Sequence, residues 1–282
     1  MMNFSVLISV YDGEEPEYLK QALESISCQS LMPSEIVLVE DGPLKSTLVD
    51  VIGDFRPRLP IVSLMLPQNV GLAAALNEGL SLCSEKIIFR ADSDDINMPD
   101  RFKVQMAFLN DNPDIDVLGG QVDSFDSFSE NIILGRRVPL AQTDIIKFAR
   151  FFSPMNHPSV AFRKNAVESV GGYPNIRTNQ DQALWALLLN NGFKFNNLDL
   201  VLVSMRVDSK FMERRLKNSF KNELQMLRFQ RKIGFIDRKT FFLMSILRWS
   251  SRLLPKIAFD FLYKIVRSSL NFLNTSRLKI ES

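Results

Sequence analysis

The stretch "EKIIFRADSDD", residues 85–95, sets an apolar run directly before three carboxylates within four positions. Such a run is typical of a buried strand. Three earlier runs have the same character, at 4–11 ("FSVLISVY"), 35–42 ("EIVLVEDG") and 61–67 ("IVSLMLP"). Because continuous apolar strands that alternate with helices indicate a parallel sheet covered on both faces, the sequence predicts an α/β fold.

Helical patterns fill the segments between and after these strands. The expected helices cover 16–27, 69–83, 99–110 and 179–190, and further apolar segments lie at 116–125 and 157–174. Asn69 is expected to cap the second of these helices, and Pro99 to stand at the first position of the third. Because no linker rich in proline or serine interrupts residues 1–205, we expect that range to form one domain.

Charge is divided unevenly along the chain. Residues 1–205 contain 26 acidic and 16 basic side chains, whereas residues 206–282 contain 6 acidic and 18 basic ones. Within this basic region, 211–235 and 239–273 are typical of amphipathic helices. Their interleaved aromatic, aliphatic and basic residues suit a helix on an anionic membrane surface, and they equally suit a helical subdomain packed on the main domain. Nucleic acid is not expected as a partner, because no known binding module is visible.

Several classes of site lack their sequence markers. The chain has no GxGxxG, GxxxxGK[ST] or GxSxG motif, which argues against a dinucleotide site, a P-loop and a nucleophile elbow. Zinc is not expected, since there are one histidine and two distant cysteines. An EF-hand alignment of 92–103 fails, because Asn97 replaces the turn glycine and Lys103 replaces the bidentate glutamate.

The location in the cell is inferred from cysteine usage and hydropathy. Cys28 and Cys83 show neither metal spacing nor a disulfide framework, and we interpret them as two buried thiols in a reducing compartment. The N-terminal apolar run is too short for a signal peptide, and no transmembrane helix is expected. We therefore expect a cytoplasmic protein that lies peripherally on the inner face of the cell membrane.

The acidic cluster itself suggests a ligand site. In an extended segment, residues two apart point the same way, so Asp92 and Asp94 are expected to converge while Asp95 begins the turn. Carboxylates gathered in this way commonly hold Mg²⁺ or Mn²⁺ and leave positions for phosphate oxygens. A solvated turn before a helix is the alternative. The position at the carboxyl end of a strand, like that of Asp41 after the second strand, favours the ligand site.

The order of these motifs resembles glycosyltransferase family 2, whose catalytic domain has the GT-A fold, a Rossmann-like nucleotide-sugar-binding architecture with a mostly parallel sheet. The resemblance covers about residues 4–200. It is carried by "SVLISVYDGEEPEYLKQALESISCQS", "EIVLVEDGP", "NVGLAAALNEGL", "FRADSDDINMPDRFKVQMAFL", "NHPSVAFRKNAVESVGGYP" and "NQDQALWALLLNNGFKFNNL". The chain is similar in particular to bacterial enzymes that extend lipid-linked oligosaccharides for O-antigen, capsule or exopolysaccharide.

That resemblance implies a donor site at the acidic cluster. Asp94 and Asp95 would bind the donor through Mn²⁺ or Mg²⁺, and Asp92 would support them. The metal would neutralise both the cluster and the charge that builds on the departing nucleoside diphosphate. His157 would contact the metal or the diphosphate, or it would be a hydrogen-bonded structural histidine.

The resemblance also places the nucleotide at the ends of the first two strands. Asp41 matches the family's acid that accepts a hydrogen bond from uracil. One departure concerns Leu76, which stands where the family often has an arginine. Arg90 either replaces that charge or pairs with a neighbouring carboxylate. The residues expected to wrap the base are Ser9, Val10 and Tyr11, and the last of these equally fits a packing role at the rim.

Asp181 is the candidate general base, because "GGYPNIRTNQDQALW" matches the family's aspartate at a helix start after a Gly-Gly-Tyr turn. It would take the proton from the acceptor hydroxyl as that oxygen attacks the anomeric carbon, a step in which position counts more than pKa. The alternative is that Asp181 only complements a helix N-terminus. Trp185, four residues on, either stacks on an acceptor sugar or packs in the core.

These features together indicate an inverting, metal-dependent glycosyltransferase. It would move a hexose, galactose or glucose, from a UDP-sugar to a lipid-diphosphate-linked saccharide, and a β-1,3 linkage is implied by the resemblance alone. A nucleotidyltransferase is one alternative, although it would normally show a glycine-rich, basic loop where this chain has "YDGEEPEYL". A catalytically silent nucleotide-binding membrane scaffold is another, and the presence of both the acidic cluster and Asp181 argues against it.

Overall fold

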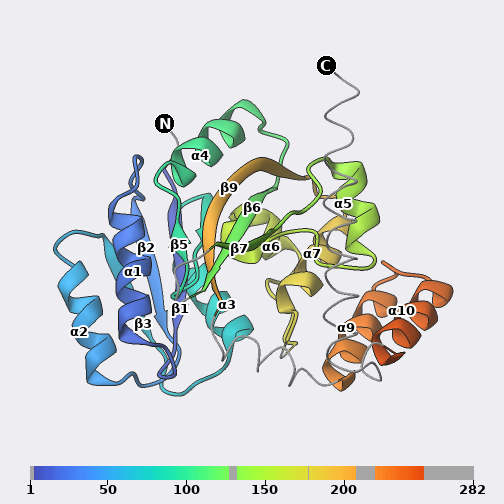
Figure 1. The fold of residues 1–282 in the computed structure, drawn as a ribbon, viewed down its shortest axis with the longest axis horizontal. Coiled ribbons are helices and arrows are strands. Elements are labelled where there is room, and N and C mark those ends of the chain that lie inside the picture. The colour runs from blue at the N-terminus through green and yellow to red at the C-terminus, as the bar shows by residue number, and fades with distance from the viewer. Residues whose placement is uncertain (1–2, 127–131, 177, 208–219, 251–282) are drawn as a thin grey trace.

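One sheet organises the part of the chain that this computed structural model describes, residues 3–126, 132–176, 178–207 and 220–250. Within these residues the sheet has nine strands in the order β3-β2-β1-β4-β8-β6-β9-β5, with β7 paired to β6 (Figure 1). The first strands are β1 (Ser5–Val10), β2 (Glu35–Glu40), β3 (Ile61–Met65) and β4 (Ile87–Arg90). The later strands are β5 (Ile96–Asn97), β6 (Val117–Asp126), β7 (Ile132–Arg136), β8 (Ala161–Arg163) and β9 (Phe195–Val207).

The four predicted apolar runs form the parallel half of this sheet. β1 pairs with both β2 and β4, and β2 pairs with β3, all in parallel. The other half is mixed, because β8 runs antiparallel to β4 and to β6, whereas β6 and β9 are parallel. Parallel pairs include most of the paired residues, so the expected α/β fold with a mostly parallel sheet is confirmed. The carboxyl ends of β1, β2 and β4 consequently lie at one end of the sheet.

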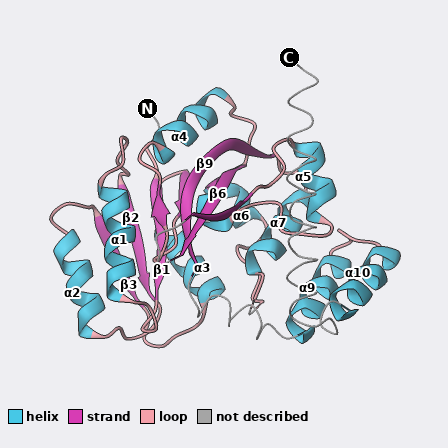
Figure 2. Ribbon diagram, in the orientation of Figure 1, coloured by secondary structure: helices cyan, strands magenta, loops and turns pink. Residues whose placement is uncertain are grey.

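Helices cover both faces of the sheet (Figure 2). Alternate strand residues face two separate cores, as Leu7 and Ile8 do, which explains why the strands read as continuous apolar runs. Helix α3 lies so close to the sheet that a Cβ atom on Gly79 would come within 2.5 Å of the Val39 side chain. One face packs against α1 (Pro16–Ser27), α2 (Ser46–Phe55) and α4 (Arg101–Asp111). The other packs against α3 (Leu72–Leu82), α5 (Gln142–Ala149), α6 (Lys164–Ser169) and α7 (Gln180–Asn190).

Two helices start later than the sequence suggests. Helix α3 has Gly71 as its N-cap, so the expected cap at Asn69 is wrong. Asn69 instead donates a side-chain N–H to the carbonyl oxygen of Asp41 at 3.2 Å. Helix α4 begins at Arg101, two residues after Pro99, so the proline does not occupy the first helical position.

Two helices of the basic region are described, α9 (Phe220–Lys232) and α10 (Arg238–Ser250). Helix α9 packs on the body of the protein through Met226, which shares a buried apolar cluster with Ala183 of α7. Helix α10 packs on α9 through Met244, which shares a buried apolar cluster with Leu227. The inner sides of both helices are therefore packed, as expected for a helical subdomain. The remainder of the second predicted amphipathic segment, from residue 251 on, lies outside the described residues.

Three further expectations concern the domain boundary, the burial of the two cysteines and the absence of a membrane-spanning helix. β9 continues to Val207, past the predicted boundary at residue 205, and the division into two regions stays a prediction. Cys83 is buried but Cys28 is exposed, so the interpretation of two buried thiols is wrong for Cys28. Among the residues that the structure describes, no helix is long and apolar enough to cross a membrane.

Candidate active site

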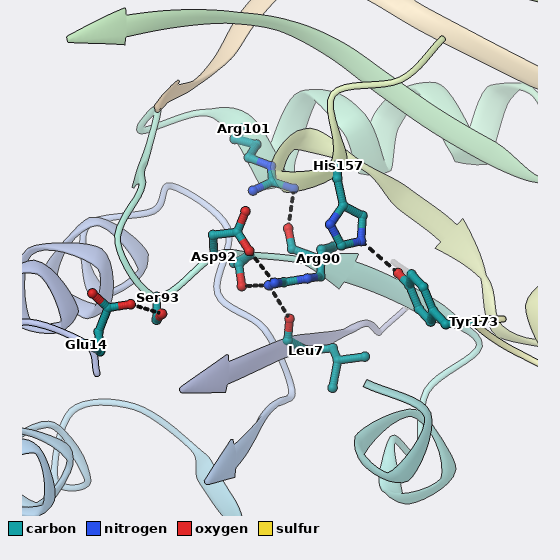
Figure 3. A network of polar contacts seen from close by, with 9 residues as sticks. Leu7, Glu14, Arg90, Asp92, Ser93, Arg101, His157 and Tyr173 are labelled. Atoms are coloured by element: carbon teal, nitrogen blue, oxygen red, sulfur yellow. Dashed lines mark hydrogen bonds and ion pairs between the residues drawn. The ribbon is translucent and has the colours of Figure 1, made fainter. Parts of the chain in front are cut away.

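Most of the predicted site residues lie at the ends of β1, β2 and β4 or in the loops that follow, and side-chain bonds join these loops. Ser93, inside the acidic segment, donates its hydroxyl proton to Glu14 Oε2 at 2.7 Å (Figure 3). The backbone N–H of Lys45 donates to Asp12 Oδ1, also at 2.7 Å. Sequence reasoning missed the nearly buried Glu14, because a loop with several carboxylates does not show which one turns inward. These bonds fix the three loops relative to one another.

Arg90, at the end of β4, is buried, with 1% of its surface exposed. Its guanidinium pairs with the Asp92 carboxylate and donates to the carbonyl oxygens of Leu7 and Ala91 (Figure 3). Two roles are expected for Arg90, and the structure shows the second, an ion pair with a neighbouring carboxylate. Leu76 is fully buried in the core on α3, so no charge stands at its position.

Burial alternates along the acidic segment. Asp92 and Asp94 are half-buried, whereas Ser93 and Asp95 are buried. This is the pattern expected if Asp92 and Asp94 point one way and Asp95 the other. Burial, with the charges of Asp94 and then Asp92, raises the pKa of the Asp95 carboxyl. The segment thus concentrates negative charge in a place where water screens it poorly.

Arg206, near the end of β9, is a further residue of this site that sequence reasoning missed. Its backbone N–H donates to Asp95 Oδ1 at 2.9 Å, and its Nε–H donates to the carbonyl oxygen of Asp94 at 3.0 Å. The guanidinium also lies 4.1 Å from the ring centroid of Tyr18 and 4.6 Å from that of Phe125. No local pattern marks Arg206, because its acidic partners stand 111 and 112 positions earlier.

Asp94 and Asp95 fit a divalent cation, but not within the predicted set of protein ligands. Among the described residues, no three acidic, histidine or cysteine side chains converge as a metal site, so Asp94, Asp95 and His157 do not form one set. His157 is engaged elsewhere, since its Nε2 hydrogen-bonds the Tyr173 hydroxyl at 3.0 Å (Figure 3). Mg²⁺ is commonly held by only one or two carboxylates together with substrate phosphates. The concentrated charge at Asp94 and Asp95 suits that second arrangement.

The charges of Arg90, Asp92 and Asp181 all act on His157. Burial, with the charge of Arg90 next, lowers the pKa of His157 to about 4, and the charges of Asp181 and Asp92 oppose that shift. The imidazole is therefore neutral at neutral pH. Ser153 Oγ lies 3.5 Å from Asp181 Oδ2 and 3.1 Å from the carbonyl oxygen of Met155, so its one proton can go to either acceptor. The structure thus brings the predicted base into the electrostatic neighbourhood of the acidic segment.

Helix α7 carries both Asp181 and Trp185. Asp181 stands in the first turn, behind the N-cap Asn179, whose φ of 61° is a left-handed conformation that asparagine tolerates well. Trp185 is fully buried and its ring packs against those of His157 and Phe195. Of the two roles weighed for Trp185, the structure has core packing, because no part of the ring is left exposed to stack on an acceptor sugar.

Asp41 lies just after β2 and is buried. Its Oδ1 accepts from the backbone N–H of Val70 at 2.7 Å, and its Oδ2 accepts from that of Gly71 at 3.1 Å. Gly42 has a φ of 90°, and a Cβ atom there would come within 2.7 Å of the Asn69 nitrogen. Glycine therefore lets this loop pass close to Asp41. The carboxylate keeps lone pairs for one further donor.

The end of β1 offers one exposed ring to a ligand. Tyr11 is 41% exposed, Ser9 is half-buried and the Val10 side chain is fully buried. Val10 contributes its backbone instead, since its carbonyl oxygen accepts the N–H of Asp41 at 2.8 Å. A Cβ atom on Gly13 would come within 2.3 Å of the Tyr11 ring, so the glycine makes room for that ring.

A mostly parallel sheet with acidic residues at its strand ends is the architecture expected of a glycosyltransferase of the GT-A fold. A family model described as Glycosyl transferase family 2 matches residues 5–171. The chain belongs to glycosyltransferase family 2. The predicted family, fold and enzyme class are thereby confirmed, and the nucleotidyltransferase alternative is wrong.

Relatives of the chain include bacterial polysaccharide enzymes. The amylovoran biosynthesis glycosyltransferase AmsE of Erwinia amylovora is 38% identical over 93% of this chain and 98% of its own. The UDP-Gal:alpha-D-GlcNAc-diphosphoundecaprenol beta-1,3-galactosyltransferase of Escherichia coli is 36% identical over 93% of this chain and 96% of its own. The solved structure of S. aureus TarS 1–349 with UDP-GlcNAc superposes with a TM-score of 0.67, over 86% of this chain and 70% of that one. At 18% identity this last likeness shows the fold alone.

Proposed function

We propose that this enzyme moves a hexose, galactose before glucose, from a UDP-sugar to a lipid-diphosphate-linked saccharide during synthesis of a bacterial surface polysaccharide. The observation that carries the proposal is the position of helix α7, which bears Asp181 in its first turn and packs Trp185 against the ring of His157, beside the region of the Arg90–Asp92 pair. The donor, the acceptor class and the β-1,3 linkage are supported by the name of the Escherichia coli relative.

The donor nucleotide binds at the ends of β1 and β2 in this proposal. Asp41 is fixed by two backbone N–H groups, so its remaining lone pairs are aimed before a ligand arrives. They accept the N–H of uracil, and the exposed ring of Tyr11 packs along the base. The polar edge of Ser9 and the backbone of Val10 border the same space. Preorganisation of this kind lowers the entropic cost of binding.

The diphosphate binds at the acidic segment. Asp94 and Asp95 would hold Mn²⁺ or Mg²⁺, which acts as a Lewis acid and offsets the charge on the departing UDP. Asp92 stays paired with Arg90, and that pair keeps the segment in place beneath the donor. His157 supports this region as a neutral, hydrogen-bonded side chain.

Asp181 acts as the general base. It accepts the proton of the acceptor hydroxyl while the acceptor oxygen attacks the anomeric carbon from the face opposite the UDP oxygen, so the configuration inverts. The Ser153 hydroxyl lies 3.5 Å from Asp181 Oδ2, and Oδ1 is the oxygen that takes the acceptor proton in this proposal. Because the acceptor is linked to a lipid, the reaction takes place at a membrane, and the basic region 206–282 holds the enzyme peripherally on its cytoplasmic face.

A release assay for UDP tests the proposal. UDP-Gal, UDP-Glc, UDP-GlcNAc and UDP-GalNAc are each supplied with synthetic lipid-diphosphate GlcNAc or GalNAc. We expect release that requires both one of the hexose donors and an acceptor, with a β-1,3 linkage in the NMR spectrum of the product. UDP-sugar binding without release in any combination would instead support the silent scaffold.

A further inference from the structure

The outward side of α10 carries an apolar stripe. Phe242, Leu243, Ile246 and Trp249 are each between 51% and 61% exposed. Their spacing places them on one side of a helix, and we call these four residues the α10 face. The opposite side of the helix is buried against α9 through Met244. Helix α10 thus packs on the protein by its inner side, and the α10 face remains exposed.

Basic side chains border the α10 face. Three basic residues of α9 are exposed and line one open hollow, Arg228 and, about one helical turn further on, Arg231 and Lys232. The Arg231 guanidinium lies 5.3 Å from the centroid of the Phe241 ring, and Phe241 directly precedes the α10 face. An apolar stripe beside exposed cations is the composition of a surface that binds anionic lipid.

A short loop connects this surface to the candidate base. Arg248 Nη2 donates to the carbonyl oxygen of Phe151 at 3.4 Å, so the loop lies beside the end of α10. Phe151 and Phe152 are 36% and 44% exposed and extend the apolar surface. The hydroxyl oxygen of Ser153, the next residue, lies 3.5 Å from the Asp181 carboxylate. The apolar surface therefore ends beside the side of the site where the acceptor hydroxyl must arrive.

We propose that the α10 face, with Phe151 and Phe152, inserts into the headgroup zone of an anionic lipid bilayer while the cations of α9 contact lipid phosphates. Asp181 would then open toward the membrane that holds the acceptor. The orientation of the site rests on the proposed function, whereas the lipid contact does not. A symmetric contact between two copies is disfavoured, because it would bring the basic side chains of α9 from both copies together.

Tryptophan fluorescence tests the contact directly. The chain has two tryptophans, of which Trp185 is fully buried and Trp249 is 54% exposed. Vesicles of brominated phosphatidylglycerol are expected to quench the fluorescence of Trp249, and vesicles of brominated phosphatidylcholine to quench it far less. The Trp249→Phe variant should lose the response. If residues 251–282 or a second copy cover the α10 face, aqueous acrylamide will fail to quench Trp249 before lipid is added. That result, or no quenching by the anionic lipid, overturns the proposal.

Paired variants test the named residues in the full chain. Phe242→Ser/Ile246→Ser is expected to weaken co-sedimentation with phosphatidylglycerol vesicles at least tenfold. The matched control, Met65→Ser/Leu200→Ser, removes two exposed apolar side chains from other elements, at 74% and 51% exposure, and is expected to bind like the wild type. Equal vesicle binding by the two variants would overturn the proposal.

Activity separates this proposal from the proposed function. With a short-chain, water-soluble lipid-diphosphate acceptor, Phe242→Ser/Ile246→Ser should turn over at the wild-type rate, and with a long-chain acceptor in vesicles it should be at least tenfold slower. Equal losses on both acceptors would contradict the assigned role of the α10 face. If the wild type binds vesicles but turns over neither acceptor, the lipid contact stands and the proposed function fails.

Discussion

Arg206 and Asp95 are joined at 2.9 Å by a backbone N–H···carboxylate bond that spans 111 positions of the chain. The same arginine also holds the Asp94 carbonyl oxygen through its side chain. β9 is thereby attached to the acidic segment at both of its candidate metal ligands. Positioning of this kind has catalytic weight, because a displacement of about 1 Å at a reacting group can cost roughly a hundredfold in rate.

Arg206→Met should therefore impair transfer while leaving the bond between the backbone and Asp95 in place. The variant loses the Nε–H donated to Asp94 and the contacts with the rings of Tyr18 and Phe125. We expect kcat/KM to fall about tenfold or more. Unfolding free energy should fall by roughly 1–3 kcal/mol, since the part-buried carbonyl oxygen of Asp94 loses its charged donor.

Arg58→Met is the matched control, because Arg58 also lies over a ring, 4.4 Å from the centroid of Phe55, but on the exposed surface. Its kinetics should equal those of the wild type. An unchanged kcat/KM in Arg206→Met would show that the acidic segment keeps its geometry without this side chain.

Asp181→Asn should abolish transfer and leave donor binding intact. The amide has nearly the same shape but cannot accept the acceptor's proton, and loss of a positioned base costs roughly 10²–10⁴-fold. Single-turnover kinetics measure the loss, and calorimetric titration with the UDP-sugar measures donor affinity. Asp144→Asn is the control, because Asp144 also stands in the first turn of a helix, α5. If both variants lose the same modest activity, Asp181 acts only on its helix terminus.

The parallel half of the fold could be predicted from the sequence because its signal is local. A buried strand such as β2 needs a continuous apolar run, and α1 was expected at 16–27, where it is found. The mixed half, with β8 between β4 and β6, escaped prediction. Its strand pairings depend on contacts between segments far apart in the chain, which no local periodicity records.

The candidate site likewise contains residues that the sequence predicts and residues that it does not. The roles of Asp41, Asp94 and Asp181 follow from a family resemblance, which assigns a role to each of their positions. Arg206 and Glu14 were missed because their function lies in partners, Asp95 and Ser93, that only the fold brings to them. Trp185 was weighed for a sugar contact because helical spacing gives a side chain's direction, but not what covers it.

Removal of divalent metal should stop the reaction. We expect turnover to fall to background in EDTA and to return with Mn²⁺ or Mg²⁺, because Asp94 and Asp95 supply too few ligands to hold a cation without the diphosphate. For the same reason, Mn²⁺ binding followed by paramagnetic resonance should be weak alone and strengthen when UDP is added. Full turnover in EDTA would remove the role assigned to these two carboxylates.

Asp95→Asn should stabilise the metal-free enzyme and inactivate it. The pKa of Asp95 is raised in the folded protein, first by burial and then by Asp94 and Asp92. Protonated Asp95 therefore favours folding, and this advantage is present below the unfolded pKa of about 4 and is lost as pH rises through the folded value. Asparagine has no charge to desolvate and can still accept the Arg206 N–H.

At pH 7 in EDTA, Asp95→Asn should consequently exceed the wild type in unfolding free energy by roughly 0.5–2 kcal/mol, the usual size of such trade-offs between stability and activity. The difference should shrink as the pH falls toward 4 and be smallest below it, where the wild-type carboxyl is protonated in both the folded and the unfolded state. Saturating Mn²⁺ with UDP should also reduce it, because the cation compensates the wild-type charge and binds only the folded protein. Denaturant titrations measure the difference at pH 7, its decrease toward pH 4 and its decrease with Mn²⁺ and UDP. A variant less stable than the wild type at pH 7 would mean that the charge on Asp95 is already compensated by the protein alone.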